Sequence, residues 1–381
     1  MKVLFVSDLY PSKEKPQYCV FLEQQAQAMQ KQGHTVDVLR IQRDDTQRGI
    51  ASSPYVQNGL NVYTWYYQHK KWNELLLLPF RECTLRPFLE ENHYDVVSLH
   101  FGSCRLFETV AKACRGLKTA VLMHYHGLNV WSDYYSHVKQ RLLQPWHNHR
   151  KKQFLNRVDA IVGVSDLTCD KVRLHHKKNN VFTVYNGVDS TIFGETQEEN
   201  VATPFQILCV GNLIPIKGQT YLLQAVAEVL KSHSVELLLV GDGPDRQKLE
   251  NQAAQLGISH QVRFLGTQPY DRVATYMAMA DMFIMPSYFE AFGCVYVEAM
   301  SSGTLTCGCE NNGAQEIIQD GVDGLLLREK SAEDIAAKIV WAIENPAEAA
   351  RLAENGKKKA AQFSWEKSAE MLLAVYEKCK K

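Results

Sequence analysis

The sequence predicts an α/β protein with two Rossmann-like, doubly wound domains that face each other across a cleft. Three observations support this fold class. Short apolar strands alternate with amphipathic helices along most of the 381 residues, as in mainly parallel sheets that helices cover on both faces. The alternation lapses once, around residues 186–204, and then restarts. A chain of this length also corresponds to roughly two or three domains.

The first domain is predicted over residues 1–195. Its strands are expected at residues 3–6, 35–39, 96–99, 120–124 and 160–164. The helix after the first strand ends at Gly33, a residue type that suits a helix C-terminus. The polar run at residues 195–200 indicates a linker to the next domain.

The second domain is predicted over residues 200–363. Its strands are expected at residues 207–210, 236–240, 262–265, 282–285, 304–307 and 324–327. A last helix, within residues 364–381, carries an apolar stripe that includes Trp365 and Tyr376. This helix either packs on its own domain or returns to the first. Sheets of this kind bind ligands beyond the carboxyl ends of their strands, so side chains there are the candidate functional residues.

Composition excludes several other classes of protein. Hydrophobic residues make up 45% of the chain, which excludes wholesale disorder. The 42 basic and 42 acidic residues balance, which argues against binding to nucleic acid in general. The longest apolar run, at residues 75–80, is far shorter than the ~20 residues that cross a bilayer. The first strand begins too early in the chain for a signal peptide.

The ten cysteines are scattered along the chain, so we expect them to be reduced in a cytoplasmic protein. Cys307 and Cys309 are the one close pair, and the two further ligands that a structural zinc ion needs are missing nearby.

The strongest chemical signal lies at residues 285–300, where Glu290 and Glu298 are separated by seven residues. Glu290 follows a strand, and Glu298 lies inside the next helix, which begins near Phe292 and Gly293. The free N–H groups and the dipole of that helix face the preceding loop, which makes an anion site suited to a diphosphate. Carboxylates there are best aimed at the hydroxyl pairs of a ribose or hexose. The alternative, a solvated Glu298, conflicts with its apolar neighbours.

A second signal lies at residues 211–218, between a strand and a helix. Gly211 allows close approach of the backbone, and Lys217 can reach a phosphate as a compact charge. The alternative is that Lys217 is a solvated surface group. Gly241 follows the next strand, where a ligand contact and a simple tight turn are both compatible with the sequence.

His124 and His126 end a strand of the first domain. A histidine at that position can donate a hydrogen bond to a substrate hydroxyl or oxyanion, although either histidine alone can be structural. The pair lacks a nearby carboxylate or cysteine that would complete a metal site. We therefore expect no metal and no cofactor.

Together these motifs resemble the GT-B glycosyltransferases of the large retaining family 4, which includes bacterial cell-wall and polysaccharide glycosyltransferases. The resemblance covers nearly the whole chain, and the Glu290 to Glu298 pattern is its most specific part. Supporting motifs lie at residues 211–218, 241–243, 186–189 and 126–127.

The resemblance implies a donor nucleotide sugar, with a UDP-sugar favoured, on the second domain and a glycan or lipid-linked acceptor mostly on the first. Glu298 would hold the ribose, Glu290 the sugar hydroxyls and Lys217 the diphosphate, while His126 would lie beside the reacting centre. The implied catalytic residues are His126, Glu290 and Lys217. The implied donor-binding residues are Gly211, Asn212, Lys217, Gly241, Arg263, Glu290, Phe292, Gly293, Cys294, Val295 and Glu298. It also favours a last helix that returns to the first domain.

Three positions depart from the family pattern. Asn212 stands where the family usually has arginine, Asn129 stands where it has aspartate, and residues 15–19 replace a glycine loop. These departures bear on phosphate affinity and rate rather than on the fold.

The departures at Asn212 and Asn129 leave open a catalytically silent sugar-binding subunit, and the same scaffold also suits a nucleotide-sugar epimerase or a sugar-phosphate synthase. A nicotinamide enzyme is disfavoured because no Gly-x-Gly-x-x-Gly follows the first strand. For a transferase we expect activity that survives EDTA. We also expect an acid limb near the ordinary histidine pKa of about 6.5, owing to His126.

A contact with the membrane surface is one interpretation of residues 65–80, which mix aromatic residues, lysines and an apolar run. Such a contact would place the protein at the inner face of the plasma membrane. The alternative interpretation is an amphipathic helix on the core of the first domain.

Overall fold

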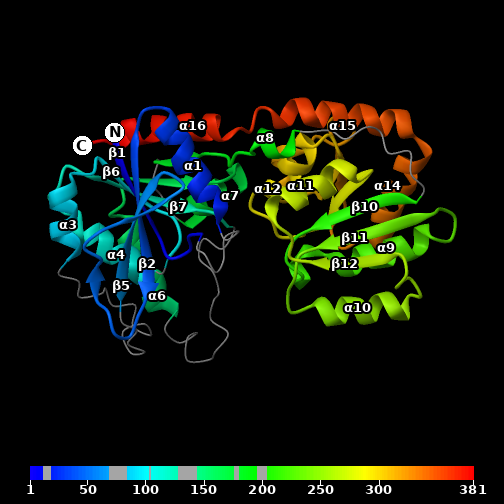
Figure 1. Cartoon of the computed structure of the whole chain (residues 1–381), viewed down its shortest axis with the longest axis horizontal. Helices are drawn as coiled ribbons and strands as arrows, with labels where there is room; N and C mark the ends of the chain where they lie inside the picture. Colours follow the sequence, from blue (N-terminus) through cyan, green and yellow to red (C-terminus); the bar gives the residue numbers. More distant parts are fainter. Residues whose placement is uncertain (12–18, 68–83, 103, 128–143, 176–179, 195–203) are drawn as a thin grey trace. The chain divides into compact units, whose positions relative to one another are not determined.

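A computed structural model describes residues 1–11, 19–67, 84–102, 104–127, 144–175, 180–194 and 204–381 (Figure 1). The chain divides into two compact units, Met1–Tyr185 with Trp365–Lys381, and Asn186–Ser364. Each unit is a largely parallel sheet with helices, which confirms the predicted α/β class with two Rossmann-like domains.

The first unit contains a nine-stranded sheet in the order β3-β5-β2-β1-β6-β7-β8-β9, with β4 paired to β5. The strands are β1 (Lys2–Ser7), β2 (Thr35–Arg43), β3 (Gly49–Ile50), β4 (Tyr55–Gln57), β5 (Leu60–Tyr67), β6 (Val96–Leu99), β7 (Ala120–Tyr125), β8 (Ala160–Gly163) and β9 (Val181–Thr183). Only β3 and β4 pair antiparallel within the described part of this sheet. The order reverses between β1 and β6, and such a switch point opens a crevice at the carboxyl ends of the strands.

Helices cover both faces of this sheet, because successive side chains of a strand point to opposite faces. The helices are α1 (Val20–Lys31), α3 (Leu85–Asn92), α4 (Cys104–Ala113), α6 (Gln144–Leu155), α7 (Asp166–His175) and α16 (Trp365–Cys379). Phe5 of β1 belongs to the core that contains Leu22 of α1 and Leu372 of α16. Leu4 belongs to the opposite core, with Phe107 of α4. In Figure 1, α16 (red) runs beside α1 (blue), with which it makes contact.

Strand β5 is an element that the sequence analysis did not foresee. Trp65 is fully buried in it and lies opposite Ile41 of β2. The aromatic start of the proposed membrane-surface segment is therefore part of the core. The rest of that segment, residues 68–80, lies outside the described residues, as do residues 15–18 and Asn129. No helix in the described ranges has the length and hydrophobicity needed to cross a bilayer.

The second unit contains a six-stranded parallel sheet in the order β12-β11-β10-β13-β14-β15. Its strands are β10 (Phe205–Val210), β11 (Val235–Val240), β12 (Val262–Gly266), β13 (Met282–Met285), β14 (Leu305–Cys309) and β15 (Leu325–Leu327). Its helices are α8 (Ser190–Phe193), η1 (Pro215–Lys217, a 3-10 turn), α9 (Gln219–Val229), α10 (Arg246–Gln255), α11 (Tyr270–Met279), α12 (Cys294–Ser301), α13 (Ala314–Ile317), α14 (Ala332–Glu344) and α15 (Pro346–Ala360). Here the switch point lies between β10 and β13.

The first unit ends at Tyr185, ten residues before the boundary expected at residue 195. The segment after it belongs to the second unit because it packs there. The amide of Val188 donates to the carbonyl of Phe363 at 2.7 Å, and the buried ring of Phe193 packs against Tyr270 in a T-shaped arrangement with the ring centroids 4.8 Å apart.

Candidate functional site

An ion pair joins the two loops at the switch point of the second sheet. Lys217 ends the turn η1 after β10, and Glu290 lies in the loop after β13. The Lys217 Nζ donates to Glu290 Oε2 at 2.5 Å, and both side chains are 16% exposed. Because few waters reach such a pair, the two charges are poorly screened. This pair therefore places a cation and an anion together at the edge, within reach of a ligand.

The loops that carry this pair pack backbone to backbone, which requires a glycine at position 218. Gly218 has a φ of +73°, and a Cβ there would lie 2.2 Å from the carbonyl oxygen of Pro286. The amide of Tyr288 donates to the carbonyl of Ile216 at 3.1 Å. A side chain at position 218 would therefore displace the loop that holds Glu290.

Helix α12 begins next to Glu290. Gly293 precedes it with a φ of +87°, and within the described residues no side chain caps this terminus. The amide of Tyr296 donates to the carbonyl of Gly293 at 3.0 Å, so the N–H groups of Cys294 and Val295 present the positive end of the dipole. Phe292 is buried beneath the turn, whereas Cys294 and Val295 are partly exposed.

The thiol of Cys294 is a neutral neighbour of this terminus rather than a nucleophile. Burial, with a further contribution from Glu298, raises its pKa to about 12. The side-chain amide of Asn186 donates to Cys294 Sγ at 3.4 Å. Asn186 is the first residue of the second unit, so the motif at residues 186–189 reaches this site through its side chain.

Glu298, one helical turn into α12, is buried and bonded. The hydroxyl of Tyr270 donates to Glu298 Oε1 at 2.9 Å, and the side chain is only 7% exposed. Burial raises the pKa of Glu298 to about 7, although the bond from Tyr270 acts in the opposite direction. The solvated alternative for Glu298 is therefore wrong, and its carboxyl group titrates near neutral pH.

Three further predicted residues of this domain, Gly211, Asn212 and Gly241, follow the ends of two neighbouring strands. Gly211 and Gly241 follow β10 and β11, and a Cβ on Gly241 would lie 2.1 Å from the carbonyl oxygen of Gly211. Asn212 is exposed, and its carbonyl accepts a bond from the side chain of Gln219 at 3.1 Å. These residues lie at the same sheet edge as Lys217.

Arg263 requires a correction. It is the second residue of β12, and its guanidinium lies 3.6 Å from Glu236 near the start of β11. The carboxyl end of β12, Gly266, is three residues further on, which is about 10 Å along a strand. Arg263 thus lies toward the amino edge of the sheet, and we remove it from the donor-binding set.

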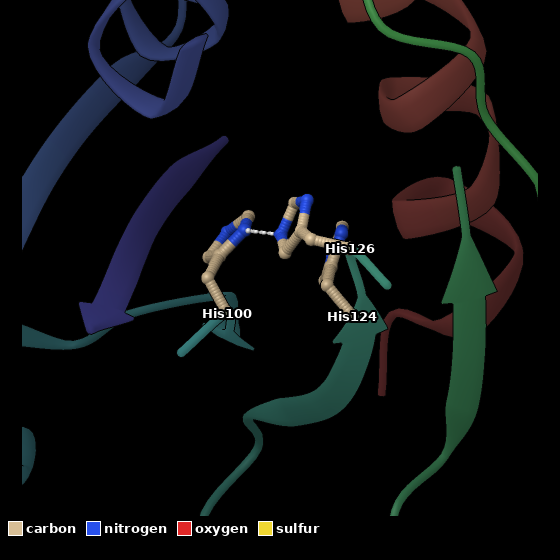
Figure 2. Close-up of side chains that lie close together, drawn as sticks. All are labelled: His100, His124 and His126. Atoms are coloured by element: carbon tan, nitrogen blue, oxygen red, sulfur yellow. Dashed lines mark hydrogen bonds between the residues drawn. The ribbon is translucent and has the colours of Figure 1, made fainter. Parts of the chain in front are cut away.

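The carboxyl edge of the first sheet carries three stacked histidines (Figure 2). His124 and His126 lie two residues apart at the end of β7, and His100 directly follows β6. Because Leu99 is in register with Met123, His100 comes next to His124, and their ring centroids are 4.2 Å apart. His100 Nδ1 and His126 Nε2 share a hydrogen bond of 3.0 Å.

Burial among aromatic rings keeps these imidazoles neutral. It lowers the pKa of His126 to about 3, and those of His100 and His124 well below the usual value. The ring centroids of Phe5 and His100 are 4.3 Å apart, and those of Phe101 and His126 are 4.7 Å apart. The expected acid limb near 6.5 from His126 is therefore wrong.

His124 is held in place by Ser98, which is bonded in turn by the last helix. Its Nε2 bonds to Ser98 Oγ at 2.7 Å, and the hydroxyl of Tyr376 in α16 donates to the same oxygen at 2.7 Å. His124 is 3% exposed, whereas His126 is less buried. The geometry thus separates a supporting histidine from a more accessible one.

Sequence reasoning missed the polar roles of three residues, which are His100, Tyr270 and Tyr376. His100 follows an apolar strand, the same signal that singled out His124, so it could have been found. Tyr270 and Tyr376 had no local signal, because their partners lie 28 and 278 positions away in the chain.

Comparison with known proteins adds the following similarities. A model of Glycosyltransferase Family 4 matches residues 20–191, and a model of Glycosyl transferases group 1 matches residues 194–359. The uncharacterized glycosyltransferase MJ1178 of Methanocaldococcus jannaschii is 33% identical over 219 residues, which span 58% of this chain and 59% of that protein. A D-inositol 3-phosphate glycosyltransferase of Nocardiopsis dassonvillei is 27% identical over 94% of this chain and 89% of its own.

A solved structure shares the fold over the whole chain. HepE of Anabaena, in complex with UDP and glucose, superposes with a TM-score of 0.73 at 20% identity and covers 99% of this chain and 100% of its own.

Proposed function

The chain belongs to the GT-B glycosyltransferases of group 1, and on this premise we propose that it is a retaining enzyme that moves a sugar from a nucleotide sugar, with UDP favoured, to a glycan or lipid-linked acceptor. The observation that carries the proposal is the Lys217–Glu290 pair beside the start of α12.

The pair suits a donor whose leaving group is a diphosphate. Without ligand, Lys217 and Glu290 neutralise each other. An arriving diphosphate offers Lys217 a stronger anionic partner and also accepts bonds from the N–H groups of α12. Glu290 is then released to accept bonds from hydroxyls of the donor sugar. Charge that develops on the departing diphosphate is stabilised in place, without a metal.

Glu298 and Tyr270 suit the ribose. A carboxylate can accept bonds from two neighbouring hydroxyls, and the bond from Tyr270 holds Glu298 Oε1 in position. The UDP in the HepE complex supports a uridine nucleotide as the first candidate. Asn212, which carries no charge, leaves Lys217 as the cation that we assign to the diphosphate.

His126 is assigned to the reacting carbon by resemblance to the family. A neutral imidazole can donate one hydrogen bond to a sugar hydroxyl, and burial keeps this ring neutral. We also propose a cytoplasmic location, because the eight cysteines whose side chains the structure describes are unpaired, as in a reducing compartment. The proposal includes a peripheral contact with the membrane, which residues 68–80 would make.

The test is a panel of UDP-, GDP- and ADP-sugars, with binding and nucleotide release measured in the presence and absence of acceptor glycans. We expect one donor to bind and to release its nucleotide rapidly only with an acceptor. Formation of an epimeric nucleotide sugar without acceptor would indicate an epimerase, and a sugar phosphate as acceptor would indicate a sugar-phosphate synthase. Binding without turnover for every acceptor would indicate a silent subunit.

A further inference from the structure

The three histidines of the first unit place metal-binding atoms close together. One ring nitrogen from each of His100, His124 and His126 lies within 4.8 Å of the other two. The rings come from the ends of adjacent strands and share one side of the sheet (Figure 2). Sequence reasoning had considered only His124 and His126, for which it found no third ligand. His100 supplies one.

The hydrogen bonds of the cluster are incomplete. His100 Nε2 and His126 Nδ1 are buried without a partner in the described part of the chain. A neutral imidazole has one N–H and one lone pair. Since His100 and His126 share one bond, one of the two remaining nitrogens is an unmatched N–H and the other an unmatched lone pair. A buried polar group without a partner is costly, so the hydrogen bond between the two rings leaves this pair incompletely satisfied.

We propose that His100, His124 and His126 bind one divalent transition-metal ion of the zinc class through their ring nitrogens. Neutral imidazoles suit zinc, cobalt, nickel and copper, whereas magnesium and calcium prefer oxygen ligands. The cluster offers imidazole nitrogens alone.

The dimensions fit after small side-chain rotations. Zinc-to-nitrogen bonds of about 2.0–2.1 Å in a tetrahedron place the nitrogens about 3.3 Å apart. His100 Nδ1 and His126 Nε2 are now 3.0 Å apart. The ring nitrogen of His124 lies no more than 4.8 Å from a nitrogen of each other ring and has to move closer to reach the same ion. Zinc sites with three protein ligands commonly take a water as the fourth ligand.

A supporting shell for one ligand already exists. His124 Nε2 is engaged with Ser98, which Tyr376 also contacts. A ligating histidine commonly has its other ring nitrogen bonded in this way, which fixes the tautomer and the orientation of the ring. His124 Nδ1 is then the nitrogen left for the ion.

The ion would act as an inhibitor rather than as a cofactor. It would occupy His126, whose ring the proposed transfer reaction needs free. This consequence rests on the proposed function, whereas metal binding itself does not.

The test is a titration of the metal-free full-length protein with Co²⁺, followed by Zn²⁺. We expect one equivalent of Co²⁺ to give the visible bands of a tetrahedral nitrogen site, and Zn²⁺ to displace it. His100→Ala and His124→Ala should each weaken binding at least tenfold. The matched control is His149→Ala, since His149 is exposed and bonds only to Gln153 among the partners that the structure gives it.

Two results would overturn the site, and both come from the unmodified chain, so neither depends on whether a variant folds. One is the absence of stoichiometric Co²⁺ bands, or bands with thiolate charge transfer, which would place the ion on cysteines. The other is an anomalous diffraction peak at the zinc edge away from these rings. If Zn²⁺ binds at the rings and transfer is unaffected, the site stands, and the proposed role of His126 is wrong.

Discussion

The carboxyl edges of the two sheets occupy equivalent places in similar folds, but they keep their functional groups in opposite electrostatic states. In the second unit, Lys217 and Glu290 form an ion pair. In the first unit, the histidines lose their charge because aromatic neighbours bury them. The fold thus sets the position of a site, and the local residues set its chemistry. A charged edge suits a diphosphate, and a neutral edge suits hydroxyls or a soft cation.

Removal of the cation from the charged edge should have the largest effect. We expect Lys217→Ala to lower turnover about 100-fold or more, because the departing diphosphate loses its stabilising charge and also faces an unpaired Glu290. Donor-sugar preference should change little. Steady-state kinetics with several donors measures both quantities.

The matched control for Lys217→Ala is Lys231→Ala, which removes an exposed lysine that pairs with Glu228. If turnover of the preferred donor stays within threefold of wild type, another cation serves the diphosphate.

Glu298→Ala should act on nucleotide affinity. A hydrogen bond to a charged group contributes about 1.5–3 kcal/mol, so UDP should bind roughly 10- to 100-fold more weakly by calorimetry. Glu228→Ala is the control, because Glu228 is exposed. Unchanged UDP affinity, with UDP the true nucleotide, would remove the ribose role of Glu298.

The neutral edge is tested by His126→Ala and His124→Ala. We expect His126→Ala to lower turnover about tenfold, because the variant loses one hydrogen bond to the donor sugar. Nucleotide affinity should be retained. His124→Ala should mainly lower the melting temperature, because it leaves Ser98 and Tyr376 with an incomplete network. An inactive but folded His124→Ala beside an active His126→Ala would reverse the two roles.

The pH dependence of UDP binding should reflect the titration of Glu298 in the second unit. The pKa of Glu298 is raised to about 7 by burial, so its ionised, better accepting form is lost as pH falls. UDP affinity should decrease about tenfold between about pH 8 and about pH 6, which follows from the ionised fraction. Tyr270→Phe removes the donor that favours the ionised form, so it should move the midpoint to higher pH. A flat profile by calorimetry would contradict this assignment.

Local patterns in the sequence were sufficient for part of this picture. Alternating strands and helices gave the class of both units, and the spacing of Glu290 and Glu298 placed them at one helix start. The Lys217–Glu290 bond joins residues 73 positions apart, and the contact between His100 and His126 spans 26. Such contacts depend on strand order, which no local pattern contains. Arg263 was included through the resemblance alone, although its place near the start of a strand argued against it.

The return of α16 to the first unit has a consequence for the synthesis of the chain. Residues Trp365–Lys381 complete a core that begins with Met1–Tyr185, and Trp365, Leu372 and Tyr376 are buried in it. The ribosome must therefore make the whole second unit before the first can close, and until then the apolar side of α1 lacks its cover. The contiguous unit Asn186–Ser364 can fold while translation continues. Expressed separately, residues 186–364 should fold into a stable domain. Residues 1–185 should need residues 365–381, supplied in trans, in order to fold.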